Sequence, residues 1–256
     1  MPIVHAADLK VHYEEAGRGA EIVVFVHGEW GSWRCWQPLM ARLPAARYHS
    51  YALDQRGCGQ TEGPDNDYTI PQRAGDLAAF TRALNLRPVH LVGQSLGAAV
   101  ATQYALDHLR AVKTLTLLSP PPVQGAMLTE EMLQAPAQYK QDRQLLIRAL
   151  RVMAPTVRDD ALFQALVEDA LSQRLQSAMK DGPALMGWNV EKKLGRLPVP
   201  TLIVRGELDT IVSHANAERA AQAFAQARLE IIPKAGHCLA TEAPDRLLVL
   251  LLTHMR

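Results

Sequence analysis

Residues 89–97 of this chain read VHLVGQSLG, an apolar run followed by a turn with glycine on either side of a serine. The run 89–92 is typical of a buried strand, and a helix-like stretch follows the turn. The turn itself has the pattern G-x-S-x-G, from Gly93 to Gly97 with Ser95 at its centre. A serine on so sharp a strand-to-helix turn holds its hydroxyl out above the edge of a sheet. We therefore predict a nucleophilic serine here, with a plain glycine-rich turn as the alternative.

Strand-like and helix-like stretches alternate on both sides of this turn. The strand-like runs are short, and most are apolar throughout, as strands buried on both faces are; they span residues 22–27, 48–53, 89–92, 114–118, 201–205 and 229–232. The helix-like stretches span residues 33–43, 71–84, 96–108, 215–225 and 244–254. Such alternation predicts an α/β fold, a mostly parallel sheet with helices on both faces. Residues 3–15 predict one or two antiparallel strands at one edge.

The alternation is interrupted in the second half of the chain. Three consecutive prolines, 120–122, close the preceding strand because proline cannot donate to a sheet ladder. The following stretch reads as several helices, of which 145–153 and 161–179 are the clearest. We expect a helical cap inserted over the C-terminal edge of the sheet, which divides the chain into a core domain, residues 1–119 and 201–256, and a cap, residues 120–200.

One histidine and one acid have positions that suit a serine nucleophile, which needs an adjacent base. Of nine histidines, His237 lies in a loop directly after the last predicted strand and before the last helix. Asp209 follows the strand 201–205, and the order serine, acid, histidine is the one expected for this kind of sheet. Glu207 is close enough to be a rival acid, while His27 has a position typical of a structural residue.

Two backbone amides are candidates for stabilising an oxyanion. One belongs to Leu96, which follows the predicted nucleophile at a helix N-terminus. The second should come from the loop after an earlier strand, and this indicates Glu29. A glutamate at this place is unusual. Its side chain either points to solvent or reaches the substrate pocket and favours a cationic or hydroxyl-bearing substrate.

Four residues are candidates for contacting the substrate. Trp30 adjoins the expected oxyanion loop, and Gln94 precedes the predicted nucleophile. Trp188 and Met127 belong to the expected cap, where several methionines offer an adaptable apolar surface. Plain packing is the competing interpretation for the tryptophans and methionines. The set indicates a mainly apolar pocket for a small or medium-sized ester.

A second glycine-containing turn follows the strand-like run 48–53. Residues 54–61 read DQRGCGQT, which suggests phosphate binding at first sight, but the spacing G-x-G-x-x-G is absent because Gly63 falls one position too early. We interpret this segment as a tight structural turn held by a network of Asp54 and Arg56.

Composition restricts the possible partners and compartment. The chain of 256 residues is 48% hydrophobic and 21% charged with a net charge of +1, so we expect neither a nucleic-acid nor a membrane partner. Its three cysteines form no C-x-x-C pair, which argues against a disulfide framework or a zinc site. Neither a leader-like N-terminus nor an apolar run of about 20 residues is visible. We expect a cytoplasmic monomer or homodimer that acts on a small molecule.

Taken together, these motifs resemble the α/β-hydrolase superfamily, and in particular its small esterases, cofactor-free haloperoxidases (perhydrolases), enol-lactonases and meta-cleavage C–C hydrolases. The matching motifs occur in the correct order; they are His27-Gly28, Asp54-x-Arg56-Gly57-x-Gly59, Gly93-x-Ser95-x-Gly97, Gly206-x-x-Asp209, and Gly236-His237 followed by Glu242 and Pro244.

The resemblance implies two-step acyl transfer by Ser95, His237 and Asp209, with Glu29 and Leu96 holding the oxyanion and with neither a metal nor an organic cofactor. Epoxide hydrolases and haloalkane dehalogenases of this superfamily carry aspartate in place of Ser95, which argues against an alkyl-enzyme here.

Three functions follow from this reading. The first is hydrolysis of a carboxylic ester or lactone. The second is a neighbouring reaction of the same three residues, C–C bond hydrolysis of a diketone or perhydrolysis. The third is a non-enzymatic ligand receptor or scaffold on the same fold, against which the complete set of catalytic residue types argues.

Overall fold

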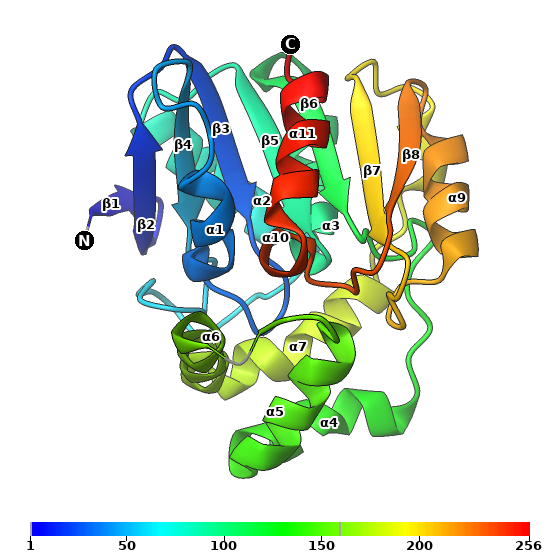
Figure 1. The fold of residues 1–256 in the computed structure, drawn as a ribbon. Helices are drawn as coiled ribbons and strands as arrows, with labels where there is room; N and C mark the ends of the chain where they lie inside the picture. Colours follow the sequence, from blue (N-terminus) through cyan, green and yellow to red (C-terminus); the bar gives the residue numbers. More distant parts are fainter. Residues whose placement is uncertain (1, 159) are drawn as a thin grey trace.

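An eight-stranded sheet with the order β1-β2-β4-β3-β5-β6-β7-β8 forms the centre of the computed structural model, which describes residues 2–158 and 160–256 (Figure 1). Pairing of β1 with β2 and of β2 with β4 is antiparallel, and all other pairs are parallel. The predicted mostly parallel sheet with an antiparallel edge is therefore confirmed. The strands are β1 Ile3–Ala6, β2 Leu9–Gly17, β3 Glu21–Val26, β4 Tyr48–Leu53, β5 Val89–Gln94, β6 Val112–Leu118, β7 Thr201–Gly206 and β8 Ala227–Ile232.

Helices cover both faces of the sheet (Figure 1). One face carries η1 Trp33–Trp36, α1 Gln37–Met40, α10 Leu239–Glu242 and α11 Pro244–His254, whose apolar side chains form one buried cluster with the sheet. The other face carries α2 Ile70–Ala83, α3 Leu96–Asp107 and α9 His214–Ala223, with the short turn η2 Leu109–Ala111 after α3. Strands β5 and β7 are buried along their whole length, which explains why their sequences are mainly apolar.

The predicted helix 33–43 is wrong in detail, because the structure has a 3-10 turn, η1, followed by the four-residue helix α1. Pro38 lies in the first turn of α1 and has no amide to continue an earlier helical ladder. The stacking of Trp36 on Phe25, with ring centroids 4.9 Å apart, fixes this segment to the sheet.

Residues 120–200, which we call the cap segment, form five helices between β6 and β7. They are α4 Glu130–Gln141, α5 Arg143–Met153, α6 Ala161–Ser172, α7 Leu175–Met186 and α8 Glu191–Leu194. Figure 1 shows α4 to α7 gathered beyond one edge of the sheet. The single helix predicted for 161–179 is wrong: α6 ends before Gln173, which is extended (φ −50°, ψ 134°) and buried, and α7 begins two residues later.

The turn after β4 is structural, but the network expected for it is wrong. The Asp54 carboxylate accepts hydrogen bonds from the amides of Trp33 (2.8 Å) and Gln60 (3.0 Å) and pairs with His12. Arg56 pairs instead with Asp76 on α2, through Nε (2.5 Å) and Nη2 (2.7 Å). Two separate networks therefore hold this turn.

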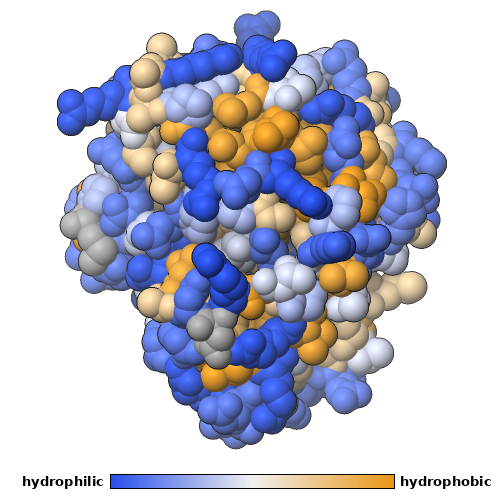
Figure 2. Space-filling view, in the orientation of Figure 1, coloured by the Kyte–Doolittle hydropathy of each residue, from blue (hydrophilic) through white to orange (hydrophobic). Residues whose placement is uncertain are grey.

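The surface mixes apolar and charged side chains over both the sheet and the cap segment, as the face in Figure 2 shows. Large exposed apolar side chains of the cap segment are Met127, Met132, Val152, Leu175 and Met186. Within the described residues, no helix combines the length and the apolarity needed to cross a membrane.

Candidate active site

Ser95 lies on the turn between β5 and α3 in a strained backbone conformation, with φ +52°. Strain of this kind costs roughly 1–3 kcal/mol and persists only where the surroundings enforce it. The Ser95 amide donates to the Leu118 carbonyl at 2.9 Å. A Cβ on Gly93 would lie 2.3 Å from the Gly97 carbonyl oxygen, and one on Gly97 would lie 2.2 Å from the Val26 carbonyl oxygen. Only glycine fits at these two positions, so the sheet and α3 together determine the turn.

His237 and Asp209 meet at the same edge of the sheet. Nδ1 of His237 lies 3.0 Å from Oδ2 of Asp209, and both side chains are almost fully buried. The rival Glu207 accepts a hydrogen bond from the Lys234 amide instead (2.9 Å). Burial alone would raise the pKa of Asp209, but the hydrogen bond and charge of His237, aided by the Val212 amide, hold this pKa below its ordinary value. Asp209 is therefore an ionised partner for the imidazole.

The loop that carries His237 is held from two sides. The Glu242 carboxylate accepts hydrogen bonds from the amides of Gly236 and Cys238, both at 3.0 Å. The His237 amide itself donates to the carbonyl of Met153 at the end of α5, at 2.8 Å. Thus a helix of the cap segment contacts the backbone of the candidate base directly.

The turn after β3 brings Glu29 beside the candidate nucleophile. A Cβ on Gly28 would lie 3.0 Å from Ser95 Cβ, so the two turns are in close contact. Trp30 has φ +58°, and its amide donates to Oε1 of Gln173 in the cap segment at 3.1 Å. Within the described residues, the Glu29 amide makes no hydrogen bond. The Leu96 amide lies in the first turn of α3, where amides have no intrahelical acceptor.

Two connected spaces flank Ser95. An inner cavity of about 60 Å³ lies between the sheet edge and helices α5 and α6, and His237 lines it together with Leu150, Phe163 and Leu166. An outer groove of about 910 Å³ runs along α4 and α7. Ser95, Glu29, Trp30 and Met153 line both spaces. Most other lining side chains are apolar.

Three of the four predicted substrate contacts line the spaces at Ser95, and the fourth does not. Trp30 lines both spaces and meets Tyr139 of α4 edge to face. Gln94 lines the inner cavity, and Met127 lies at the exposed rim of the groove with 95% of its surface accessible. The structure does not bring Trp188 to Ser95: its Nε1 donates to Gln103 of α3 at 3.2 Å, and in the described part of the chain it lines neither space. Trp188 is buried in the hydrophobic core beside α3.

The sequence analysis did not identify α5 and Tyr139 as lining the spaces beside Ser95. The signal was present, because Leu146, Leu150 and Met153 are spaced four and three residues apart and so share one face of α5. Leu150 and Met153 line the inner cavity, and Leu146 is buried.

Two cysteines also line the inner cavity, Cys35 and Cys238. Burial raises the pKa of the Cys238 thiol to about 12, and it raises that of Cys35 as well. Both are therefore protonated at neutral pH and are poor nucleophiles. Ser95 is left as the candidate nucleophile of this cavity.

The base has one nitrogen available for proton transfer. Within the part of the chain that the structure describes, Nε2 of His237 is buried and has no hydrogen-bond partner. A base that is oriented through Nδ1 and lines the same cavity as a strained serine can accept the proton of that serine when a substrate displaces the solvent.

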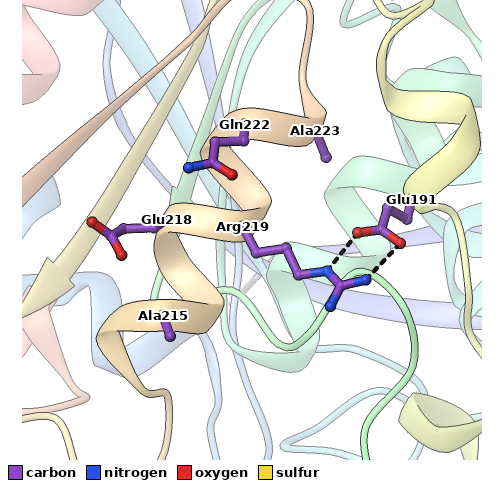
Figure 3. A pocket seen from close by; sticks show the side chains of 6 residues that line it. All are labelled: Glu191, Ala215, Glu218, Arg219, Gln222 and Ala223. Carbon is purple, nitrogen blue, oxygen red and sulfur yellow. Dashed lines mark hydrogen bonds and ion pairs between the residues drawn. The ribbon is translucent and has the colours of Figure 1, made fainter.

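Another pocket, of about 530 Å³, lies at α8 and α9 (Figure 3). Its Arg219 guanidinium is bound by both carboxylate oxygens of Glu191, at 2.6 and 3.1 Å. Glu218 is paired with His214 at 3.3 Å. Arg219 is therefore already bound by a protein carboxylate, and the chemistry is expected at Ser95. Among the described residues, no group of three or more His, Cys, Asp or Glu side chains is arranged to hold a metal ion.

Comparison with known proteins agrees with this fold. A model of the alpha/beta hydrolase family matches residues 23–249, and the chain therefore belongs to that family. A 2-hydroxy-6-oxo-6-(2'-aminophenyl)hexa-2,4-dienoic acid hydrolase from Metapseudomonas resinovorans is 28% identical over 261 residues, which cover 94% of this chain and 86% of that protein.

Solved structures show the same fold along the whole chain. An esterase from Exiguobacterium antarcticum has a TM-score of 0.90 and 23% identity, with 99% of this chain and 98% of that chain covered. The N-acyl homoserine lactone degrading enzyme Est816 has a TM-score of 0.83 and 26% identity, with 98% and 99% covered.

Proposed function

We propose that this protein is a serine hydrolase that cleaves a carboxylic ester or lactone of a small to medium, mainly apolar substrate. One observation carries the proposal: His237 is bonded to ionised Asp209 through Nδ1, its Nε2 has no partner among the described residues, and it lines the same cavity as Ser95. Each of the three residue types then has the role that acyl transfer requires.

In the proposed reaction, Ser95 Oγ attacks the substrate carbonyl while His237 Nε2 takes the hydroxyl proton. The amides of Glu29 and Leu96 donate to the oxyanion that forms. When the tetrahedral intermediate collapses, His237 gives the proton to the leaving oxygen and the alcohol departs. Water then attacks the acyl-enzyme with His237 again as base, and the acid and free Ser95 are regenerated. Asp209 holds the imidazole in the required tautomer and stabilises its cation.

The two spaces at Ser95 support an assignment of the two parts of the substrate. Of the described residues, His237 lines the inner cavity but not the groove. The leaving oxygen must reach His237, so we assign the alcohol part to the inner cavity and the acyl part to the groove. The unequal sizes of about 60 and 910 Å³ favour a small alcohol and a longer acyl chain.

Hydrolysis of 4-nitrophenyl esters of increasing acyl length tests the proposal, with Ser95→Ala alongside. We expect turnover by the natural chain, an optimum beyond acetate, and loss of nearly all activity in the variant. Methyl and hexyl esters of one acid test the assignment, which predicts preference for the methyl ester. Equal activity of the natural chain and Ser95→Ala would contradict the proposal.

C–C bond hydrolysis is a second candidate, supported by the 28% identity to the hydrolase of a 2-hydroxy-6-oxo dienoic acid. It uses the same three residues on a ketone carbonyl, with carbon as the leaving atom. Ser95-dependent consumption of such a dienoic acid, without turnover of the esters, would favour this candidate.

Perhydrolysis is a further reaction of the same three residues, in which hydrogen peroxide is the attacking molecule. Addition of hydrogen peroxide to the ester assay distinguishes perhydrolysis from hydrolysis. If no substrate is consumed and a fluorophosphonate also fails to react with Ser95, a function as a non-enzymatic receptor or scaffold replaces the proposed hydrolase functions.

A further inference from the structure

The side chain of Glu29 is placed where a substrate must pass. It belongs to the turn that touches Ser95, and it lines both the inner cavity and the groove. A side chain shared by both spaces lies at their junction, which is also where the scissile carbonyl must sit. The amide of this residue serves the oxyanion in the proposed reaction, but nothing in that reaction uses the carboxyl group.

Unlike other acids near this turn, Glu29 has no partner for its carboxyl group. Asp54 accepts from two amides, and Asp169 of α6 accepts from Ser32 Oγ at 2.6 Å and from Arg34 Nε at 2.8 Å. Among residues 2–158 and 160–256, no side chain or amide forms a hydrogen bond or ion pair with the Glu29 carboxyl. The Glu29 side chain is only half-buried, so its carboxyl group is available to hydrogen-bond with a ligand that enters either space.

The charge state of Glu29 follows from its surroundings. Burial, and then the nearby carboxyl of Asp181 on α7, raise its pKa to about 8, and Arg73 on α2 opposes this only in part. His237, which is neutral when it acts as the base, lines the same inner cavity. At neutral pH Glu29 is therefore mostly a neutral acid, which can donate one hydrogen bond through its hydroxyl.

We propose that the Glu29 side chain is a specificity-determining group that donates a hydrogen bond to a second oxygen of the substrate, close to the scissile carbonyl. The preferred substrates are then esters or lactones whose acyl part carries a keto or hydroxyl oxygen near the carbonyl. This inference rests on the proposed ester or lactone hydrolysis. Trp30 and Met153, which line the same junction, surround this polar contact with apolar surface.

The test compares kcat/KM for ethyl butanoate, ethyl 3-hydroxybutanoate and ethyl 3-oxobutanoate in three proteins. These are the natural chain, Glu29→Gln, which keeps a donor, and Glu29→Met, which has similar length and no donor. We expect the natural chain to prefer the oxygenated esters about tenfold, as one neutral hydrogen bond allows. Glu29→Gln should keep the preference and Glu29→Met should lose it. The ratio within each protein cancels any common effect on the oxyanion turn.

Glu218→Gln on α9, in the separate pocket of Figure 3, is the matched control and should keep the natural ratio. Retention of the preference in Glu29→Met would overturn the role of Glu29 and leave the proposed hydrolysis standing. A preference of the natural chain for the cationic ester ethyl 3-aminobutanoate would also overturn the role of Glu29 as a hydrogen-bond donor. Such a preference would show that Glu29 binds a cation as a carboxylate. If the natural chain hydrolyses none of these esters or 4-nitrophenyl esters in a Ser95-dependent way, the proposed function fails and this inference fails with it.

Discussion

The turn that carries Ser95 and the turn that carries Glu29 lie in contact, but different parts of the molecule hold them. Ser95 is held by the core, through the hydrogen bond that its amide donates to the Leu118 carbonyl of β6 and through the close approach of Gly97 to β3. The Glu29 turn is held from the core, where His27 contacts the Gly28 carbonyl and the Gln55 amide, and also from the cap segment, because the amide of Trp30 donates to Gln173. Thus the sheet positions the candidate nucleophile, whereas the cap segment helps to position a candidate oxyanion donor.

The histidine loop combines the two kinds of support. Asp209 and Glu242 hold it from the core, and the Met153 carbonyl of α5 accepts its amide. Gln173 is in turn held by Ser177 (3.1 Å) and Asp181 (2.8 Å), and Asp181 forms an ion pair with Arg73 of the core helix α2. The cap segment is therefore part of the site rather than only a cover, and changes in the two regions should have different consequences.

The largest effect is expected from Asp209→Asn, which removes a core-held charge. An amide cannot stabilise the imidazole cation and favours the wrong tautomer, so we expect kcat for ester hydrolysis to fall about 10⁴-fold, as in other serine–histidine–aspartate enzymes. Glu207→Gln is the control and should leave kcat nearly unchanged, because Glu207 contacts Lys234 instead. Steady-state kinetics of both variants show which of the two acids orients His237. Comparable losses in the two would show that Asp209 is not the orienting acid.

Glycine substitutions compare the rigidity of the two regions. A Cβ in Gly97→Ala would meet the Val26 carbonyl oxygen at 2.2 Å, and we expect a loss of about 3 kcal/mol or more in the free energy of unfolding. In Gly182→Ala of α7 the Cβ would meet the ends of two leucine side chains at 3.0 Å. These can shift, and alanine favours a helix by up to about 1 kcal/mol, so the net change should be small. Denaturant unfolding measures both, and equal losses would contradict the contrast.

A smaller effect is expected from Gln173→Leu, because this residue acts through the Trp30 turn. Loss of the acceptor should leave the turn less well positioned and lower kcat about 10- to 100-fold with little change in KM, less than loss of an oxyanion donor itself. Gln138→Leu, at an exposed position of α4, is the control. Thermal unfolding is measured in parallel. An unchanged kcat in a folded Gln173→Leu protein would mean that the cap segment does not position the turn.

The smallest effect is expected in the alkaline pH profile. The pKa of Glu29 is about 8, so its carboxyl is neutral below that pH and becomes negative above it. A negative charge beside the developing oxyanion opposes the reaction, and kcat/KM should fall several-fold between about pH 7 and pH 9.5. Glu29→Gln cannot ionise and should flatten this limb. The same alkaline fall in both proteins would assign it to another group.

Most of the fold could be predicted from the sequence, because buried parallel strands leave uninterrupted apolar runs and the G-x-S-x-G turn marks one edge of the sheet. Ser95, His237 and Asp209 were each placed after a strand, and parallel strands bring such loops to one edge. The sequence favoured Asp209 but left Glu207 as a rival, since both follow the same strand; in the structure Asp209 contacts His237 and Glu207 contacts Lys234. The break at Gln173 was hidden because nothing in its local sequence ends a helix; tertiary hydrogen bonds extend the chain there.

The direction in which side chains point was the second feature that the sequence could not predict. Trp188 was expected over the site because it lies in the cap segment, but its indole turns toward α3. Conversely, Tyr139 and the apolar face of α5 reach the site although no motif marks them. A motif records where the backbone must turn, whereas the walls of a pocket depend on how helices pack, and many apolar sequences satisfy that packing.

Labelling by a fluorophosphonate, followed by intact mass and peptide mapping, tests the central claim most directly. Such a reagent phosphonylates an activated serine, and the account predicts a single adduct on Ser95 in the folded natural chain. The folded Ser95→Ala protein and the denatured natural chain should carry none. Failure of the folded natural chain to react, or an adduct on any residue other than Ser95, would contradict the claim that Ser95 is an activated nucleophile.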